Sequence, residues 1–184
     1  MKIIKPEIEG LLIVEPLVYG DSRGYFMEFW NDKLFADNGI NFKPVQFNES
    51  GSSYGVIRGL HYQLNPYAQA KLVRVASGKV LDVAVDLRKD SPTFGKHHSV
   101  ILSAENKKQF LIPGGFAHGF SVLSDFAVFS YICDHYYDQS SERGISLSDK
   151  FLNIDWLIPE KKRIISPKDL DHPDFHNAEM NFKL

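Results

Sequence analysis

Residues 80–87 read Val-Leu-Asp-Val-Ala-Val-Asp-Leu, and this run decides the fold class. Its apolar residues at 81, 83, 85 and 87 alternate with positions that include Asp82 and Asp86, which is the two-residue period of a β-strand. Turn-forming residues enclose it, with Ser-Gly-Lys at 77–79 and Lys-Asp-Ser-Pro-Thr-Phe-Gly at 89–95. The run therefore predicts a short strand between two turns.

Similar short runs recur along the chain. The 14 Phe and 8 Tyr favour β-structure, and further strands are predicted near 11–18, 24–30, 44–49, 56–62, 71–76, 98–102, 108–112, 119–123 and 126–133. One short helix is predicted from Asn31 to Asn38, with Asn31 as N-cap and Gly39 just beyond its end. Many short strands with little helix predict an all-β fold, a sandwich or a jelly-roll barrel. We expect one domain over residues 1–184, less regular after about Asn153.

Composition excludes several classes of protein. The chain has 184 residues, 21 Lys+Arg against 23 Asp+Glu and a net charge of −2, which does not suggest disorder or nucleic-acid binding. A single Cys cannot form an internal disulfide. The most apolar region, 110–133, is interrupted by Pro and Gly and does not read as a membrane span. The N-terminus lacks the apolar core of a signal peptide. We expect a soluble cytoplasmic protein that does not associate with membranes.

Two histidines stand in segments that resemble the metal-binding motifs of cupin barrels. Residues 113–118 follow the pattern Pro-x-Gly-x-x-His of the second motif, which ends at His118. The first motif would need His-x-His and a nearby Glu, but His61 is followed by Tyr and Gln63, with no acidic residue before Lys71. Two His and a Gln beside a cation are a poor ligand set for Zn²⁺ or Fe²⁺. We expect a barrel with no metal and no cofactor.

The strand predicted at 44–49 carries Gln46 and Asn48 on its polar face. From this segment alone, a surface strand with its polar side in water is the simpler interpretation. A small barrel that binds a polar ligand would show the same alternation with the polar side inward.

Further motifs follow one another in a fixed order and make a more specific pattern. They are Asp-Ser-Arg-Gly-Tyr-Phe at 21–26, Arg-Gly-Leu-His-Tyr-Gln at 58–63, Gln-Ala-Lys-Leu-Val-Arg at 69–74, Asp-Val-Ala-Val-Asp-Leu-Arg at 82–88, Ser-Pro-Thr-Phe-Gly at 91–95, Pro-Gly-Gly-Phe-Ala-His-Gly-Phe at 113–120, and Tyr131 with Tyr136-Tyr137. From about Gly10 to Asp169, the chain resembles the dTDP-4-dehydrorhamnose 3,5-epimerase family.

The resemblance implies a metal-free, cupin-like jelly-roll homodimer whose N-terminal strands exchange between subunits. The implied reaction epimerises C3 and C5 of dTDP-4-keto-6-deoxyglucose to give dTDP-4-keto-L-rhamnose, a step of dTDP-L-rhamnose synthesis. The implied roles are His61 as base, Tyr131 as acid and Asp169 as the partner that orients His61, and Lys71 corresponds to the lysine of the family's Gln-x-Lys-Leu-Val segment. Implied substrate contacts are Arg23, Phe26, Glu28, Gln46, Asn48, Arg58, His118, Glu142 and Lys168.

The chemistry fits these residue types. A neutral imidazole, with an ordinary pKa of ~6.5, suits removal of a proton next to a ketone. A general base contributes only ~10²–10⁴-fold, so a cation such as Lys71 is needed to stabilise the developing enolate. A phenol such as Tyr131, ordinarily protonated at pH 7, can return a proton to the opposite face. Asp171 rivals Asp169 as the partner of His61, because the path of the C-terminal backbone cannot be read from the sequence.

Four alternatives stay open at this point. A close relative would invert C3 only, or act on another nucleotide-linked 4-keto sugar, with the same base and acid. A sugar 3,4-ketoisomerase is disfavoured by the Arg-Gly-Leu-His and Ser-x-Lys-Asp motifs. A non-catalytic sugar-nucleotide-binding cupin would bind the ligand without exchanging its protons. A metal-dependent cupin oxygenase would carry a stoichiometric metal ion.

Overall fold

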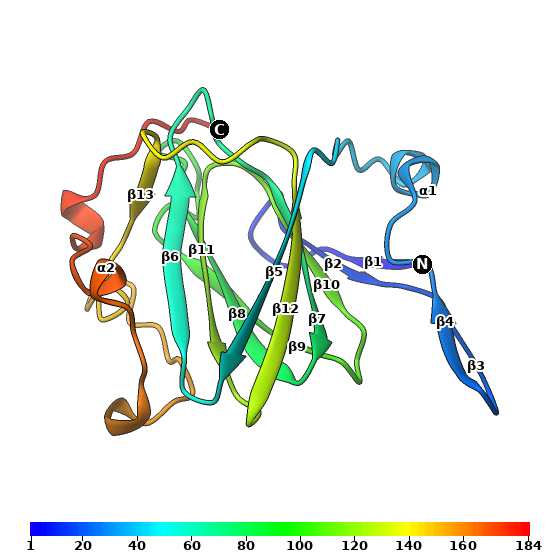
Figure 1. Cartoon of the computed structure of the whole chain (residues 1–184). Coiled ribbons are helices and arrows are strands. Elements are labelled where there is room, and N and C mark those ends of the chain that lie inside the picture. Colours follow the sequence, from blue (N-terminus) through cyan, green and yellow to red (C-terminus); the bar gives the residue numbers. More distant parts are fainter.

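The computed structural model describes residues 1–184 and contains two antiparallel sheets that face each other across a barrel (Figure 1). One sheet has six strands in the order β1-β2-β10-β7-β12-β5, and the other has five in the order β13-β6-β11-β8-β9. Most neighbours in these sheets are far apart in the sequence, as in a jelly roll. The predicted all-β, cupin-like fold is confirmed.

The six-stranded sheet contains β1 (Lys2–Ile4), β2 (Leu12–Glu15), β10 (Gln109–Ile112), β7 (Lys71–Ser77), β12 (Phe126–Cys133) and β5 (Gln46–Ser53). The five-stranded sheet contains β13 (Glu142–Gly144), β6 (Ile57–Gln63), β11 (Phe116–Val122), β8 (Lys79–Asp86) and β9 (His97–Ser103). A separate hairpin is formed by β3 (Val18–Asp21) and β4 (Gly24–Met27). The helices are α1 (Asp32–Asp37), α2 (Pro167–Leu170) and two 3₁₀ turns, η1 (Glu160–Lys162) and η2 (Phe175–Asn177).

The strands lie close to their predicted ranges, with one clear correction. The strand predicted at 11–18 is two elements, because β2 ends at Glu15 and β3 begins at Val18. Pro16 separates them, since proline has no N–H to donate to a ladder. Strands β1 and β13 have three residues each, too few for a periodic pattern to reveal them. The irregular C-terminal stretch is confirmed, as it contains only η1, α2 and η2 after 153.

Helix α1 begins and ends as predicted. The Asn31 side chain accepts a hydrogen bond of 3.0 Å from the Leu34 N–H, which caps the first turn. Gly39 follows the last turn with a φ of +77°, a conformation that glycine adopts without steric cost. Local capping chemistry alone was enough to place this helix.

Strand β8 is buried on both faces. Leu81, Val83 and Val85 pack outward against the C-terminal segment, which includes Trp156 and Phe175, in one hydrophobic cluster. The opposite face of β8 points into the barrel, where Val80 and Ala84 belong to a second cluster. The aspartates of the alternating run are therefore not exposed: Asp82 and Asp86 are both fully buried.

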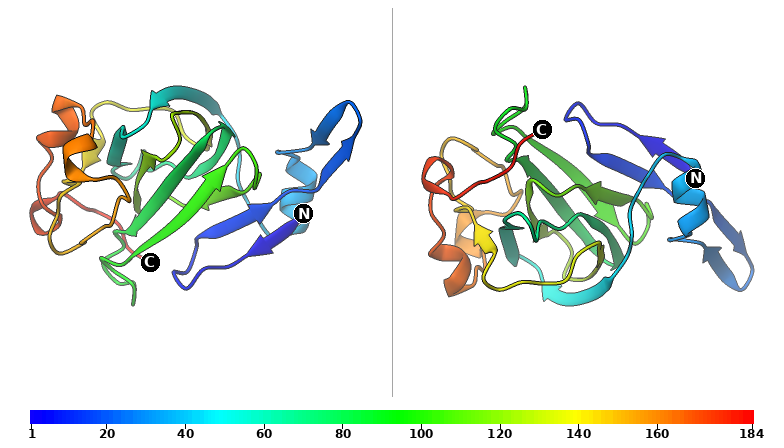
Figure 2. Two further views of the ribbon diagram at one scale, coloured as in Figure 1. Left: turned by 90° about the horizontal axis from the view of Figure 1, so that it is seen from below. Right: turned by 90° about the horizontal axis from the view of Figure 1, so that it is seen from above.

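The C-terminal and N-terminal elements lie on opposite sides of the barrel (Figure 2). The segment after β13 covers the five-stranded sheet, and the Trp156 indole donates a 2.8 Å hydrogen bond to the Leu147 carbonyl. Helix α1 packs Phe35 against the outer face of the six-stranded sheet, next to Leu72 and Ile132. The β3–β4 hairpin projects away from the barrel. None of the helices has the length and apolar composition that a membrane-spanning helix requires.

Candidate active site

Two adjoining cavities of about 340 and 350 Å³ open between the two sheets, and His61, Lys71 and Tyr131 line both of them. His61 comes from β6, Lys71 from β7 and Tyr131 from β12, so the two sheets face each other across the site. The first cavity is also lined by Ser50, Arg58, His118, Phe129, Ser166, Lys168 and Asp169. The second is also lined by Gln46, Asn48, Gln63, Gln69, Tyr137 and Glu142.

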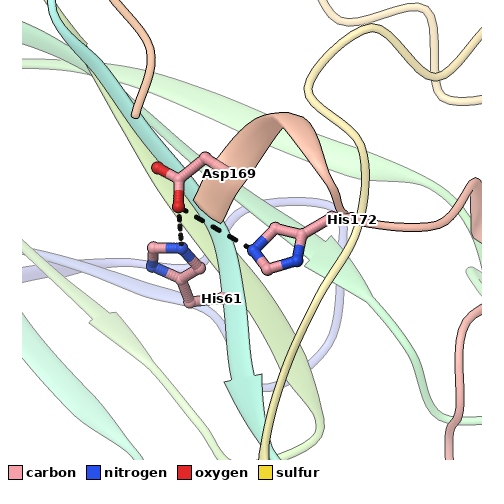
Figure 3. Close-up of side chains that lie close together, drawn as sticks. All are labelled: His61, Asp169 and His172. Atoms are coloured by element: carbon pink, nitrogen blue, oxygen red, sulfur yellow. Dashed lines mark hydrogen bonds and ion pairs between the residues drawn. The ribbon is translucent and has the colours of Figure 1, made fainter. Parts of the chain in front are cut away.

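His61 is hydrogen bonded to a carboxylate from the distant C-terminal segment (Figure 3). Its Nε2 lies 2.8 Å from Asp169 Oδ1, and the Gly59 N–H donates to the other oxygen of the same carboxylate at 3.4 Å. Because a carboxylate only accepts, the Nε2–H of His61 donates and Nδ1 keeps its lone pair. Asp169, and not Asp171, is the partner of His61 in this structure.

Helix α2 holds Asp169 in place. Ser166 caps the helix, and its hydroxyl accepts from the Asp169 N–H at 3.1 Å, while Pro167 occupies the first helical position. Burial alone raises the pKa of the Asp169 carboxyl, but the hydrogen bond and charge of His61 outweigh it and hold that pKa below its ordinary value. The pair is therefore an ionised carboxylate and an oriented imidazole.

His118 has a different carboxylate partner. Its Nε2 lies 3.0 Å from both oxygens of Asp82, which is fully buried on β8. His61 and His118 are register partners on β6 and β11, yet each ring is engaged by its own aspartate. Gln63, the third position of the cupin-like pattern, donates to the Tyr67 carbonyl and accepts from the Asp138 N–H. With Lys71 in the same cavity, this donor set does not fit a cupin metal ion.

Lys71 places its ammonium group in the lining of both cavities. Burial lowers the pKa of its ammonium group, while the nearby carboxyl groups of Asp82 and Glu142 raise it and offset part of that effect. Burial also raises the pKa of the neighbouring Cys133 thiol to about 11, so that group is a neutral thiol at pH 7. An ammonium in such a partly dry site stabilises a developing oxyanion more strongly than it would in water.

Tyr131 lines the same cavity from β12 of the six-stranded sheet, the sheet that also carries Lys71 and that lies opposite the strand of His61. Its ring is partly buried beside Phe129, with ring centroids 6.1 Å apart. Burial is the main cause of a raised pKa of its phenol, which keeps the hydroxyl protonated at neutral pH. The protonated phenol of Tyr131 can act as an acid, and the free Nδ1 of His61 can act as a base. The two groups lie on opposite sides of the same cavity.

Polar side chains line the outer part of the site. Gln46 donates to Asn48 at 3.0 Å, and both face the cavity, which corrects the surface-strand interpretation of this segment. The outward side of the same strand carries Phe47 instead. Glu142 Oε2 accepts from the Lys168 ammonium at 2.5 Å and from the Tyr137 hydroxyl at 2.9 Å.

Three residues predicted to contact substrate lie elsewhere in this chain. Arg23 and Phe26 belong to the projecting β3–β4 hairpin, where Arg23 pairs with Asp21, and Glu28 accepts from Asn31 just after it. None of the three lines the two cavities. The other predicted residues do line them: Gln46, Asn48, Arg58, His61, Lys71, His118, Tyr131, Glu142, Lys168 and Asp169.

Sequence reasoning missed three residues beside the site. Asp82 is hydrogen bonded to His118. Its even position in the alternating run 80–87 could have indicated that it faces the inside of the barrel. Tyr137 lines the second cavity. The Tyr136-Tyr137 pair was noted in the sequence, but no contact with substrate was predicted for it. His172 lies three residues after Asp169 and just beyond the end of α2, and its Nε2 lies 3.8 Å from the same carboxylate (Figure 3).

A jelly-roll barrel with an oriented histidine, a buried lysine and a protonated tyrosine around one cavity defines an acid–base enzyme. The family model described as dTDP-4-dehydrorhamnose 3,5-epimerase matches residues 5–177. A curated relative with that name from Shigella flexneri is 54% identical over 97% of this chain and 98% of its own length.

Solved structures agree in fold and sequence. A dTDP-6-deoxy-D-glucose-3,5-epimerase from Legionella pneumophila, in complex with dTDP-4-keto-L-rhamnose, has a TM-score of 0.93 and 49% identity, with 97% of this chain and 94% of that chain covered. A dTDP-4-dehydrorhamnose 3,5-epimerase from Elizabethkingia anophelis has a TM-score of 0.91 and 52% identity, covering 96% and 97%. This chain belongs to the dTDP-4-dehydrorhamnose 3,5-epimerase family.

Proposed function

We propose that the protein epimerises C3 and C5 of dTDP-4-keto-6-deoxyglucose to give dTDP-4-keto-L-rhamnose, as a step of dTDP-L-rhamnose synthesis. The observation that carries the proposal is the grouping of the His61–Asp169 pair, Lys71 and Tyr131 around one cavity. Family membership and the likeness to a structure in complex with dTDP-4-keto-L-rhamnose support this substrate.

His61 is the proposed base. The free Nδ1 removes the proton from the carbon next to the ketone, while the Nε2–H stays hydrogen bonded to Asp169. Asp169 acts as a positioning residue, since it fixes the tautomer and stabilises the imidazolium that forms. Lys71 stabilises the negative charge that develops on O4 of the sugar.

Tyr131 is the proposed acid. Because it faces the site from the other sheet, it returns a proton to the face of the carbon opposite the one from which His61 removed it. Removal on one face and return on the other inverts the centre, and one cycle at C3 and one at C5 complete the reaction. Arg58 and Lys168 carry positive charge beside the cavity and suit the diphosphate.

Proton NMR in D₂O tests this function. With dTDP-4-keto-6-deoxyglucose, the wild-type protein and the surface variant His135→Ala are expected to exchange both the C3 and the C5 proton and to form the epimer. His61→Ala is expected to lose both exchanges. Exchange at C3 alone would identify a 3-epimerase. Tight binding with no exchange would identify a sugar-nucleotide-binding protein and overturn the catalytic roles.

We also propose a homodimer in which each β3–β4 hairpin reaches the active site of the partner. The hairpin exposes large aromatic side chains, with Phe26 67% and Tyr19 63% accessible, and Phe47 on the outer face of β5 is 64% accessible. Apolar surface of this kind is typical of a protein interface. Exchange would bring Arg23, Phe26 and Glu28, which lie away from the cavity of their own chain, to the cavity of the other.

A complementation experiment tests the exchange. Arg23→Ala and His61→Ala homodimers are each expected to be nearly inactive. After unfolding and refolding of an equal mixture, half of the dimers are mixed and have one intact site of two, so about one quarter of wild-type activity should return. No recovery in a confirmed mixed dimer, or sedimentation as a monomer, would overturn the exchange.

The free, buried Cys133 fits the reducing cytoplasm that we propose as the location.

A further inference from the structure

A second imidazole approaches the carboxylate that orients His61. His172 Nε2 lies 3.8 Å from Asp169 Oδ1, the same oxygen that accepts from His61 Nε2 (Figure 3). The rings of His61 and His172 are nearly perpendicular, at 85°, and their centroids are 5.5 Å apart. The two imidazole nitrogens and the carboxylate oxygen all lie within 4.8 Å of one another.

His172 is largely buried in this position, but its Nε2 makes no hydrogen bond. Its side chain is only 13% exposed, and Nε2 is buried with no hydrogen bond. The ring occupies space that Gly144 leaves open, since a Cβ at residue 144 would lie 2.3 Å from the ring. Buried polar atoms in native proteins nearly always have a hydrogen-bond partner. The unpartnered His172 Nε2 lies close to His61 and Asp169, two further side chains that can bind a metal ion, so the cluster indicates a binding site.

We propose that His61, Asp169 and His172 form a binding site for a divalent transition metal ion, with Zn²⁺ the best match, and that an ion bound there inhibits the enzyme. Two imidazoles and one carboxylate are a common Zn²⁺ ligand set. Bonds of about 2.0–2.2 Å in a tetrahedral shell put neighbouring ligand atoms roughly 3.3 Å apart. The distances from Asp169 Oδ1, 2.8 Å to His61 and 3.8 Å to His172, lie on either side of that value.

The Asp169 carboxylate supplies the anionic ligand that the His61, His118 and Gln63 set lacks, and it offsets the positive charges of Lys71 and Arg58 that line the same cavity. Both imidazoles converge on one oxygen of this carboxylate, with His61 Nε2 at 2.8 Å and His172 Nε2 at 3.8 Å. The nearest ammonium on this segment, Lys168, is paired with Glu142. Asp169 and His61 both line the cavity, which gives an ion a route in.

Metal binding and proton abstraction need opposite tautomers of His61. As the base, His61 keeps its proton on Nε2 and its lone pair on Nδ1. A metal ion on Nε2 needs the lone pair there, so the proton moves to Nδ1 and the imidazole stays neutral. The atom that would remove the substrate proton is then already protonated. The inhibition, though not the binding, rests on the proposed role of His61.

This site differs from the metal position of a cupin barrel. The cluster combines β6 with the C-terminal segment, whereas His118 points to Asp82. The ion is an inhibitor here and takes no part in the reaction.

Titration with Co²⁺, which absorbs visible light when bound by nitrogen and oxygen ligands, tests the site on chelator-treated protein. We expect one Co²⁺ per chain, bound more weakly as the pH falls because protons compete for the imidazoles. His172→Ala should weaken Co²⁺ binding by at least about 10-fold, since even loss of an outer partner costs that much. The exposed His135→Ala serves as the matched control and should bind as wild type does.

Activity assays with Zn²⁺ complete the test. Zn²⁺ should inhibit wild type and His135→Ala, excess chelator should restore both, and the rate of His172→Ala, compared with its own chelator-treated rate, should not fall when Zn²⁺ is added. His172→Phe, which fills the space without a ligand atom, replaces His172→Ala if that variant does not fold. Equal Co²⁺ affinity in wild type and the His172 variants would overturn the site. Metal binding that depends on His172 but leaves activity unchanged would support the site and overturn the role of His61 as base.

Discussion

His61 and Asp169 are 108 residues apart in the sequence, yet Nε2 of one lies 2.8 Å from Oδ1 of the other. The strand that carries His61 is part of the five-stranded sheet, and Asp169 belongs to the segment that covers the outer side of that sheet. The orientation of the base therefore depends on how the C-terminal segment packs, through buried side chains such as Trp156 and Phe175.

Asp169→Asn is expected to reduce kcat by ~10²–10⁴-fold while KM changes little. An amide can donate to Nε2, which favours the tautomer with the proton on Nδ1, and it cannot stabilise the imidazolium. Steady-state kinetics check this, and an unchanged melting temperature separates it from misfolding. Asp171→Asn is the matched control, since Asp171 is exposed at the end of α2 and should retain wild-type kinetics.

Tyr131→Phe is expected to separate proton exchange from inversion. His61 can still remove a proton and return one to the same face, so deuterium should enter C3 and C5 from D₂O. Formation of the epimer should fall by ~10²–10⁴-fold, the usual contribution of a general acid. Proton NMR follows both events in one sample, with Tyr54→Phe as the control. An undiminished rate of epimer formation would assign the acid to another residue.

Lys71→Gln is expected to reduce both exchange and epimerisation by ~10²–10³-fold, because the enolate loses its cationic partner. The wild-type enzyme should also lose activity at alkaline pH. Since burial lowers the pKa of Lys71, the ammonium is present below that lowered pKa and disappears as the pH rises through it, earlier than for an exposed lysine. A pH–rate profile measures this. Lys79→Gln, an exposed strand lysine, should leave the profile unchanged.

Asp86→Asn is expected to destabilise the fold by about 3–5 kcal/mol at pH 7, because it leaves the Arg88 guanidinium without its charge partner. Burial alone raises the pKa of Asp86, but hydrogen bonds from Arg88, Ser91 and Thr93 outweigh it and hold the pKa below the ordinary value of 3.8. The stabilisation is therefore complete above that value and is lost as the pH falls through the lower, folded-state pKa.

Urea unfolding at pH 7 and near pH 3 measures this difference. The midpoints of wild type and Asp86→Asn should lie far apart at pH 7 and draw together in acid. Asp90→Asn, an exposed substitution in the same turn, should follow wild type throughout. A constant gap between wild type and Asp86→Asn at both pH values would show that the pair titrates with no net effect on folding.

Local patterns in the sequence are enough to predict the β class, the position of most strands and helix α1. These features depend on local physics: alternation along 80–87, turn residues, and the Asn31 cap followed by Gly39. Ordered motifs also pointed to the residues around the cavity. Strands of three residues, such as β1 and β13, left no local signal, because pairing with longer neighbours and not their own pattern holds them.

Two features depend on the packing of distant segments: which face of each strand is exposed to solvent, and which aspartate is hydrogen bonded to His61. Gln46 and Asn48 point into a cavity because the sheet that carries them is closed against a second sheet, and alternation alone does not say which side is inside. The choice of Asp169 over Asp171, and the approach of His172, depend on long-range packing of a segment with little secondary structure. Such contacts arise from burial of side chains that are distant in the chain, which no local pattern records.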